Sequence, residues 1–185
     1  MKVITKKALQ FQTWNESHIK GLRLLSSPLL DKHKSRIVNA FTTRIGGETP
    51  EPYDTFNIGR HVDDEALKLD ALNNRRILCS NLGLDYDQIA IPGQVHSPLV
   101  RIVEHGSPRP SMKGVDGLLT SSKNLPLLLS FADCVPVMIF DPVKEVAGIF
   151  HAGWRGTAEK IVKVGCELMV SQYHSSPEDM IAAVG

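Results

Sequence analysis

Three residues of this sequence have side chains that could together bind a metal ion: His96, Cys134 and His151. Two imidazoles and one thiolate are good zinc ligands, and three protein ligands leave a fourth position for water or substrate. The sequence lacks the closely paired ligands of a zinc finger, so the spacing alone is a weak signal. The structural alternatives are a hydrogen-bonded surface histidine at each position and an inert core cysteine.

Three charged residues could assist chemistry at such a site. Asp133 precedes Cys134 in the most apolar part of the chain, where a carboxylate needs a partner or a role in the chemistry. Arg44 is followed by glycines, and Arg155 lies where the last predicted helix begins, so free backbone N–H groups and a guanidinium could bind an anion there. The alternative for each arginine is a solvated side chain beside an ordinary turn.

The candidate ligands lie at the ends of predicted strands. His96 separates two of these strands, and Cys134 and His151 lie at ends of strands that become neighbours if the chain turns at Asp141 and Pro142. Apolar runs and turn signals predict strands over residues 37–42, 89–95, 99–103, 117–119, 125–131, 135–140 and 146–150.

Helical periodicity predicts two long helices, over residues 64–82 and 157–173. The apolar side of the first should contain Ala66, Leu67, Leu69, Leu72, Ile77, Leu78 and Leu82. Strands and helices follow one another without a regular alternation. This order favours a single α+β domain, an α/β sandwich built on a mixed sheet, over a doubly wound fold.

Composition excludes several classes of protein. The 185 residues suit one domain, and 42% hydrophobic with 22% charged residues is typical of a globular chain. A net charge of +1 gives no electrostatic reason to expect nucleic acid or a membrane surface as partner. The apolar stretch 125–140 is interrupted by Asp133 and Pro136, and residues 1–12 lack an apolar signal core. Three widely spaced cysteines form no disulfide framework, so we expect a cytoplasmic protein.

A series of short motifs resembles the polyphenol oxidase or laccase-domain family, which is also described as the multifunctional purine nucleoside phosphorylase family. The resemblance runs through most of the chain and is most specific at its last motif. The motifs are Thr42-Thr43-Arg44-Ile45-Gly46-Gly47, Asn57-Ile58-Gly59, His61-Val62-Asp63-Asp64, Asn74-Arg75, Gln94-Val95-His96, Asp116-Gly117, Ala132-Asp133-Cys134 and His151-Ala152-Gly153-Trp154-Arg155-Gly156.

The resemblance implies that His96, Cys134 and His151 bind one transition metal, usually zinc. The sequence differs from the family pattern at Ser97, where relatives often have glycine. The chain also ends at Gly185, where relatives continue. We therefore expect residues 1–185 to form a laccase-domain-like unit that lacks the C-terminal part of the family domain.

The implied activity is phosphorolysis of adenosine, inosine and methylthioadenosine, together with deamination of adenosine. Deamination suits water activated by zinc, with Asp133 as the nearest candidate to move protons. Phosphorolysis needs phosphate held beneath the sugar, and Arg44 and Arg155 would suit it.

Three other readings remain open from the sequence. A copper-dependent phenol oxidase would also use two histidines and a cysteine, although seven histidines in the chain cannot supply a trinuclear cluster besides a mononuclear site. A cysteine hydrolase would use Cys134 as nucleophile and His151 as base. A binding module would use the metal only as a structural staple.

Overall fold

The computed structural model describes residues 13–59, 64–106 and 112–185. The predicted absence of a signal core in residues 1–12 and most of the motif beginning at His61 therefore lie outside the described residues. No helix in the described part of the chain is long and apolar enough to cross a membrane.

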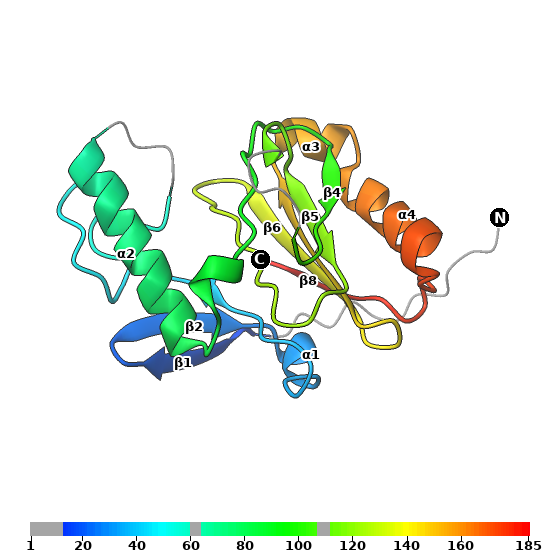
Figure 1. The fold of residues 1–185 in the computed structure, drawn as a ribbon, viewed down its shortest axis with the longest axis horizontal. Coiled ribbons are helices and arrows are strands. Elements are labelled where there is room, and N and C mark those ends of the chain that lie inside the picture. The colour runs from blue at the N-terminus through cyan, green and yellow to red at the C-terminus, as the bar shows by residue number, and fades with distance from the viewer. Residues whose placement is uncertain (1–12, 60–63, 107–111) are drawn as a thin grey trace.

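The larger of the two sheets has five strands and mixed pairing (Figure 1). Its first two strands pair in parallel and all its other neighbours are antiparallel. The strands, in sheet order, are β4 (Val100–Ile102), β5 (Gly117–Thr120), β7 (Val146–Ala152), β6 (Val135–Asp141) and β8 (Ile181–Val184). β7 is the central strand, which explains why its residues are among the most buried in the chain.

Two helices follow β7 in the sequence, α3 (Trp154–Ala158) and α4 (Ile161–Tyr173). α4 packs on β5 and β7 through Ile161 and Met169, which share a buried cluster with Phe150. Gly165 makes this contact possible, because a Cβ atom there would lie 2.1 Å from the Phe150 ring. The helix therefore lies closer to β7 than any larger residue at this position would allow.

A smaller sheet and the longest helix form the other side of the molecule (Figure 1). The sheet is the antiparallel set β1 (Asn15–Ile19), β2 (Leu22–Ser26) and β3 (Phe41–Thr42), and the helices are α1 (Pro28–Asp31), α2 (Glu65–Asn81) and the 3-10 turn η1 (Tyr86–Gln88). The Asp64 side chain begins α2 by accepting hydrogen bonds from the N–H groups of Ala66 and Leu67, which are otherwise unsatisfied at a helix start.

The predicted α+β fold with a mixed sheet is confirmed. The predicted strands that correspond to β4, β5, β6 and β7 and the predicted helix that corresponds to α2 are also confirmed. Four element predictions are wrong. Residues 89–95 and 125–131 form only one parallel bridge, between Ala90 and Leu127. The helix predicted over residues 157–173 is two helices, because Lys160 has φ 63° and breaks the helical path. The strand predicted over residues 37–42 is limited to the two residues of β3.

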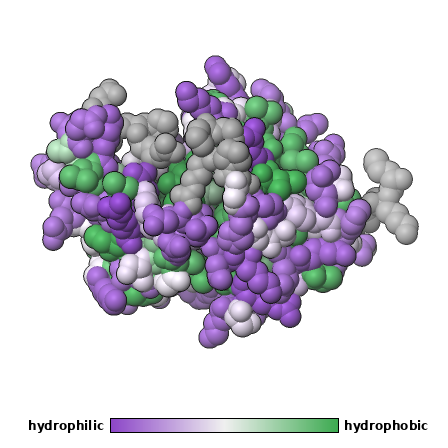
Figure 2. Space-filling model, in the orientation of Figure 1, coloured by the Kyte–Doolittle hydropathy of each residue, from purple (hydrophilic) through white to green (hydrophobic). Residues whose placement is uncertain are grey.

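The predicted apolar side of α2 is also partly wrong. Leu69 is 55% exposed and Ile77 is 42% exposed, whereas the buried residues include Asn74 and Arg75. Polar side chains occupy this buried face because α2 packs against a loop whose backbone needs hydrogen-bond partners: Asn74 donates to the hydroxyl of Thr49 and to the carbonyl of Asn57. The face of the molecule in Figure 2 is mainly hydrophilic, with hydrophobic side chains in separate small groups.

Candidate metal centre

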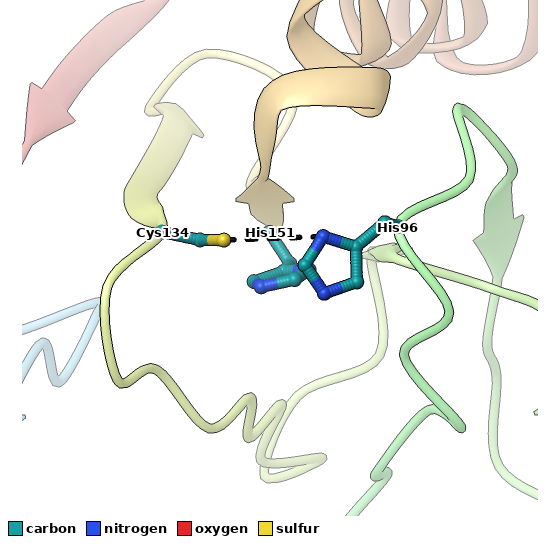
Figure 3. A group of neighbouring side chains, drawn as sticks. All are labelled: His96, Cys134 and His151. Carbon is teal, nitrogen blue, oxygen red and sulfur yellow. Dashed lines mark hydrogen bonds between the residues drawn. The ribbon is translucent and has the colours of Figure 1, made fainter.

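His96, Cys134 and His151 come together in the structure, with one ligand atom of each within 4.8 Å of the others (Figure 3). The Cys134 sulfur lies 4.0 Å from Nδ1 of His96, and the two imidazole rings meet edge to face with their centroids 4.8 Å apart. Around a tetrahedral zinc ion, ligand atoms are about 3.4–3.6 Å apart. A shift of roughly 1 Å would therefore bring these three atoms to zinc-binding distances.

Each candidate ligand comes from a different segment. His151 is near the end of β7 and only 5% exposed, while Cys134 directly precedes β6. The antiparallel register places Pro136 opposite His151, so the start of β6 meets the end of β7, as the sequence predicted. His96 lies in the loop before β4 with φ 64°, a left-handed conformation that turns its side chain toward the other two (Figure 3).

Asp116 connects two of these segments and is completely buried. Its carboxylate accepts hydrogen bonds from the backbone N–H groups of residues 95, 96 and 97, at 3.0, 2.9 and 2.8 Å. It also lies 2.8 Å from Nδ1 of His151. Burial opposes ionisation, but these hydrogen bonds outweigh it and lower the pKa of Asp116. An ionised Asp116 accepts the Nδ1 proton of His151 and leaves Nε2 with a free lone pair for a metal.

Sequence reasoning recognised Asp116 only as a motif residue and missed this connecting role. The available signal was an aspartate directly before the buried run 117–119, where a charge must be compensated. Gly153 is a second residue whose role appears only in the structure. A Cβ atom there would lie 2.6 Å from Nδ1 of His96 and 3.1 Å from the Cys134 sulfur, so glycine leaves room for the ligands.

The three candidate ligands line a cavity of about 770 Å³ between the two sides of the molecule. Its walls also include side chains suited to an aromatic and polar ligand: Phe41, Thr43, Tyr53, Asn57, Gln94, Phe131, Met138 and Ile149. Cavities of this size hold small organic molecules or cofactors. The site therefore combines a metal-binding set of donors with room for a substrate.

The three charged residues predicted from the sequence differ in their position relative to this cavity. Asp133 is exposed and lines the cavity. Arg44 also lines it, and its guanidinium donates to the side chain and backbone carbonyl of Asp54 at 2.7 and 2.9 Å. Arg155 is not among the residues that line this cavity, and its guanidinium stacks on the exposed ring of Trp154 at 4.9 Å. The structure thus brings Arg44 and Asp133 to the cavity that the ligands line.

Comparison with known proteins agrees with this picture. The chain is 29% identical over 188 residues to the purine nucleoside phosphorylase YlmD of Bacillus subtilis, an alignment that covers 98% of this chain and 62% of that protein. It is 36% identical over 155 residues to YlmD of Geobacillus stearothermophilus, with 80% and 56% covered. The chain therefore spans less than two thirds of the length of these relatives.

Solved structures show the same fold. The crystal structure of YlmD from Geobacillus stearothermophilus superposes with a TM-score of 0.80 at 33% identity, covering 91% of this chain and 63% of that one. The Bacillus licheniformis hypothetical protein YfiH gives a TM-score of 0.79 at 32% identity, with 90% and 62% covered. Residues 38–185 match the family described as multi-copper polyphenol oxidoreductase laccase, and this chain belongs to that family.

Proposed function

We propose that this protein is a zinc-dependent purine nucleoside phosphorylase. It would convert adenosine, inosine or methylthioadenosine and phosphate into the free base and the sugar 1-phosphate, and would also deaminate adenosine. The observation that carries the proposal is the set of His96, Cys134 and His151 on the wall of a substrate-sized cavity. The relatives named purine nucleoside phosphorylase support the choice of reaction.

The chemistry of the donor set suits zinc. Two imidazoles and a thiolate are zinc ligands, and a buried carboxylate that orients one imidazole is the usual partner of such a ligand. A bound zinc ion would supply Lewis-acid activation of a water molecule or a substrate oxygen. Copper is the alternative that the family description suggests, and metal analysis separates the two.

Other residues would supply proton transfer and phosphate binding. Asp133 is exposed to the cavity and would move the proton that deamination or departure of the base requires. Arg44 would bind phosphate. Because its guanidinium already donates to the Asp54 carboxylate, an incoming phosphate would replace that carboxylate or share the guanidinium with it. Arg155 would be a second phosphate-binding candidate, because it lies two residues after Gly153, whose backbone adjoins His96 and Cys134.

The aromatic walls offer a surface for the purine. Phe41 and Phe131 lie with ring centroids 5.8 Å apart, and Phe131 also packs against the His151 ring at 5.6 Å. A planar base beside Phe131 would therefore lie next to the metal centre, where its bond to the sugar or its exocyclic amine can be reached. We also propose that residues 1–185 act as one domain of this family, in the cytoplasm, where the free cysteines Cys79, Cys134 and Cys166 stay reduced.

The test is metal analysis combined with chromatography of the products. Zinc-loaded protein is mixed with adenosine, inosine or methylthioadenosine, with and without phosphate. We expect free base only when phosphate is present, and inosine from adenosine in either case. Cys134→Ala should abolish both reactions, whereas Cys166→Ala, which changes a half-buried thiol on α4, is the matched control and should retain them.

Two outcomes would redirect the proposal. Absence of turnover by zinc-loaded protein would refute the phosphorylase activity of this chain. Activity that survives chelation would favour the cysteine hydrolase instead. In that case the 4.0 Å separation between the Cys134 sulfur and His96 makes His96, as well as His151, a candidate for the base.

A further inference from the structure

The segments that lead to His96 and Cys134 run beside one another along the cavity. Residues 90 and 127 form a parallel bridge, in which the Ala90 N–H donates to the Pro126 carbonyl at 2.8 Å. The Leu128 N–H donates to the Ala90 carbonyl at 3.0 Å. At Ala90 and Leu127 the two segments are therefore joined by backbone hydrogen bonds, as neighbouring parallel strands are.

The backbone ladder cannot continue from this bridge toward the metal centre. The next donor of the first segment would be Pro92, which has no N–H group. The N–H of Gly93 donates elsewhere, to the Met112 carbonyl at 2.9 Å. Backbone pairing alone therefore leaves the ligand-bearing ends of the two segments unconnected.

The side chain of Gln94 replaces the missing ladder. Its Nε2 donates to the Ser130 carbonyl at 2.7 Å, and the Ser130 N–H donates to its Oε1 at 2.9 Å. The amide thus makes a reciprocal pair of hydrogen bonds with one residue, like a hydrogen-bonded backbone pair of an antiparallel ladder. Both partners are half-buried, so water competes weakly for these bonds.

We infer that Gln94 is a positioning residue of the metal centre, which sets the distance between His96 and Cys134. Gln94 lies two residues before His96, and Ser130 lies four residues before Cys134. The two hydrogen bonds therefore fix the distance between the two backbone segments a few residues before His96 and Cys134. Asp116 does not reach Cys134, since its hydrogen bonds go to residues 95–97 and to His151. The pairing of β6 with β7 places Cys134 near His151, and Gln94 adds a direct connection between the segments that lead to Cys134 and His96.

This inference rests on the proposed metal site, and cobalt binding can test the metal site and the role of Gln94 separately. Co²⁺ bound by a thiolate gives a sulfur-to-cobalt charge-transfer band, which reports whether Cys134 is a ligand independently of activity. We expect the wild-type protein to show this band. Gln94→Met, which has a similar length but no hydrogen-bonding amide, should bind Co²⁺ or Zn²⁺ at least about 10-fold more weakly and show a reduced band per bound cobalt.

Three further variants make the test specific. Gln94→Glu keeps the acceptor for the Ser130 N–H and should retain more of the band than Gln94→Met. Gln172→Met makes the same exchange at an exposed position of α4, and Tyr173→Phe removes a half-buried hydrogen bond away from the ligands. Both variants should keep the wild-type band.

The outcomes are separable. A wild-type protein without the charge-transfer band would refute the proposed metal centre itself. A wild-type band that persists unchanged in Gln94→Met, with unchanged metal affinity, would overturn the positioning role and leave the metal centre standing. An equal loss in Tyr173→Phe would also overturn it, since the effect would then follow from stability alone.

Discussion

Asp116 is the residue on which the geometry of the candidate metal centre depends most directly. Its buried carboxylate holds the backbone of the His96 loop and the ring of His151 at the same time. Gly153 contributes by what it lacks, because any side chain there would enter the space between His96 and Cys134. Residues outside the candidate ligand set thus help to position the ligands.

Asp116→Asn should weaken the site and the fold together. The amide has one oxygen instead of two, and its NH₂ group would face backbone N–H donors that now lack an acceptor. We expect metal affinity to fall by at least about 10-fold and the free energy of unfolding by about 3 kcal/mol. Competition with a chelator and urea unfolding of the metal-free protein measure the two effects. Asp87→Asn, at an exposed position, should change neither; an Asp116→Asn protein with wild-type values would remove the connecting role.

At the scale of elements, the close packing of α4 against β7 supports the strand that carries His151. Gly165→Ala tests this contact through two opposing effects. Alanine favours the helix by about 1 kcal/mol, but its Cβ would lie 2.1 Å from the Phe150 ring and overpack the core at a cost of about 1–3 kcal/mol. We expect the variant to be less stable than wild type in urea. A more stable Gly165→Ala protein would mean that helix propensity outweighs this packing.

A second contact between elements should appear in the pH dependence of stability. Glu104, just after β4, bonds Tyr173 at the end of α4 and the serines that follow β5. Burial raises its pKa, but hydrogen bonds from Ser122, Tyr173 and Ser121 outweigh burial, and the pKa of Glu104 is lowered in the folded protein.

The sign of the effect follows from this shift. A lowered folded-state pKa stabilises the fold above the unfolded-state value of about 4.3, and this stabilisation is lost as the pH falls through the folded-state value. Glu104→Gln should therefore be less stable than wild type at neutral pH. The difference should shrink as the pH is lowered below about 4. Urea unfolding at a series of pH values measures it, and a difference that does not change with pH would contradict the assignment.

The elements differ in how far their sequence reveals them. The strands β6 and β7 are continuous apolar runs, and the side chain of Asp64 marks the start of α2, so pattern and structure agree there. The break between α3 and α4 has no such mark, since the left-handed Lys160 is an ordinary helix-forming residue type. Residues 89–95 are mostly apolar, but Pro92 interrupts the backbone pairing that would make them a strand, and the Gln94 side chain takes its place. The connecting role of Asp116 could not be predicted in full either, because its hydrogen-bond partners are set by tertiary contacts.

At the scale of the whole molecule, the three candidate ligands connect distant parts of the chain, and the cavity they line lies between the two sides of the molecule. A bound metal would therefore cross-link the fold. At a free zinc concentration of 100 times Kd, it should add about 2.7 kcal/mol to the free energy of unfolding. Thermal unfolding with zinc and with a chelator measures this gain. Cys134→Ala should reduce it strongly and Cys166→Ala should not; equal gains in all three proteins would show that the metal binds elsewhere.

The way Asp116 holds the His96 loop has a consequence for which substitutions this loop can accept. Its partners at positions 95, 96 and 97 are main-chain N–H groups, which every amino acid except proline provides. The backbone of the loop therefore depends little on the side chain at position 95, whereas Ser97 adds hydrogen bonds from its hydroxyl group to the Gly114 carbonyl and to Asp116. A proline at position 95 or 97 would remove one of these N–H donors, so it should loosen the loop that carries His96 whatever the neighbouring side chains are.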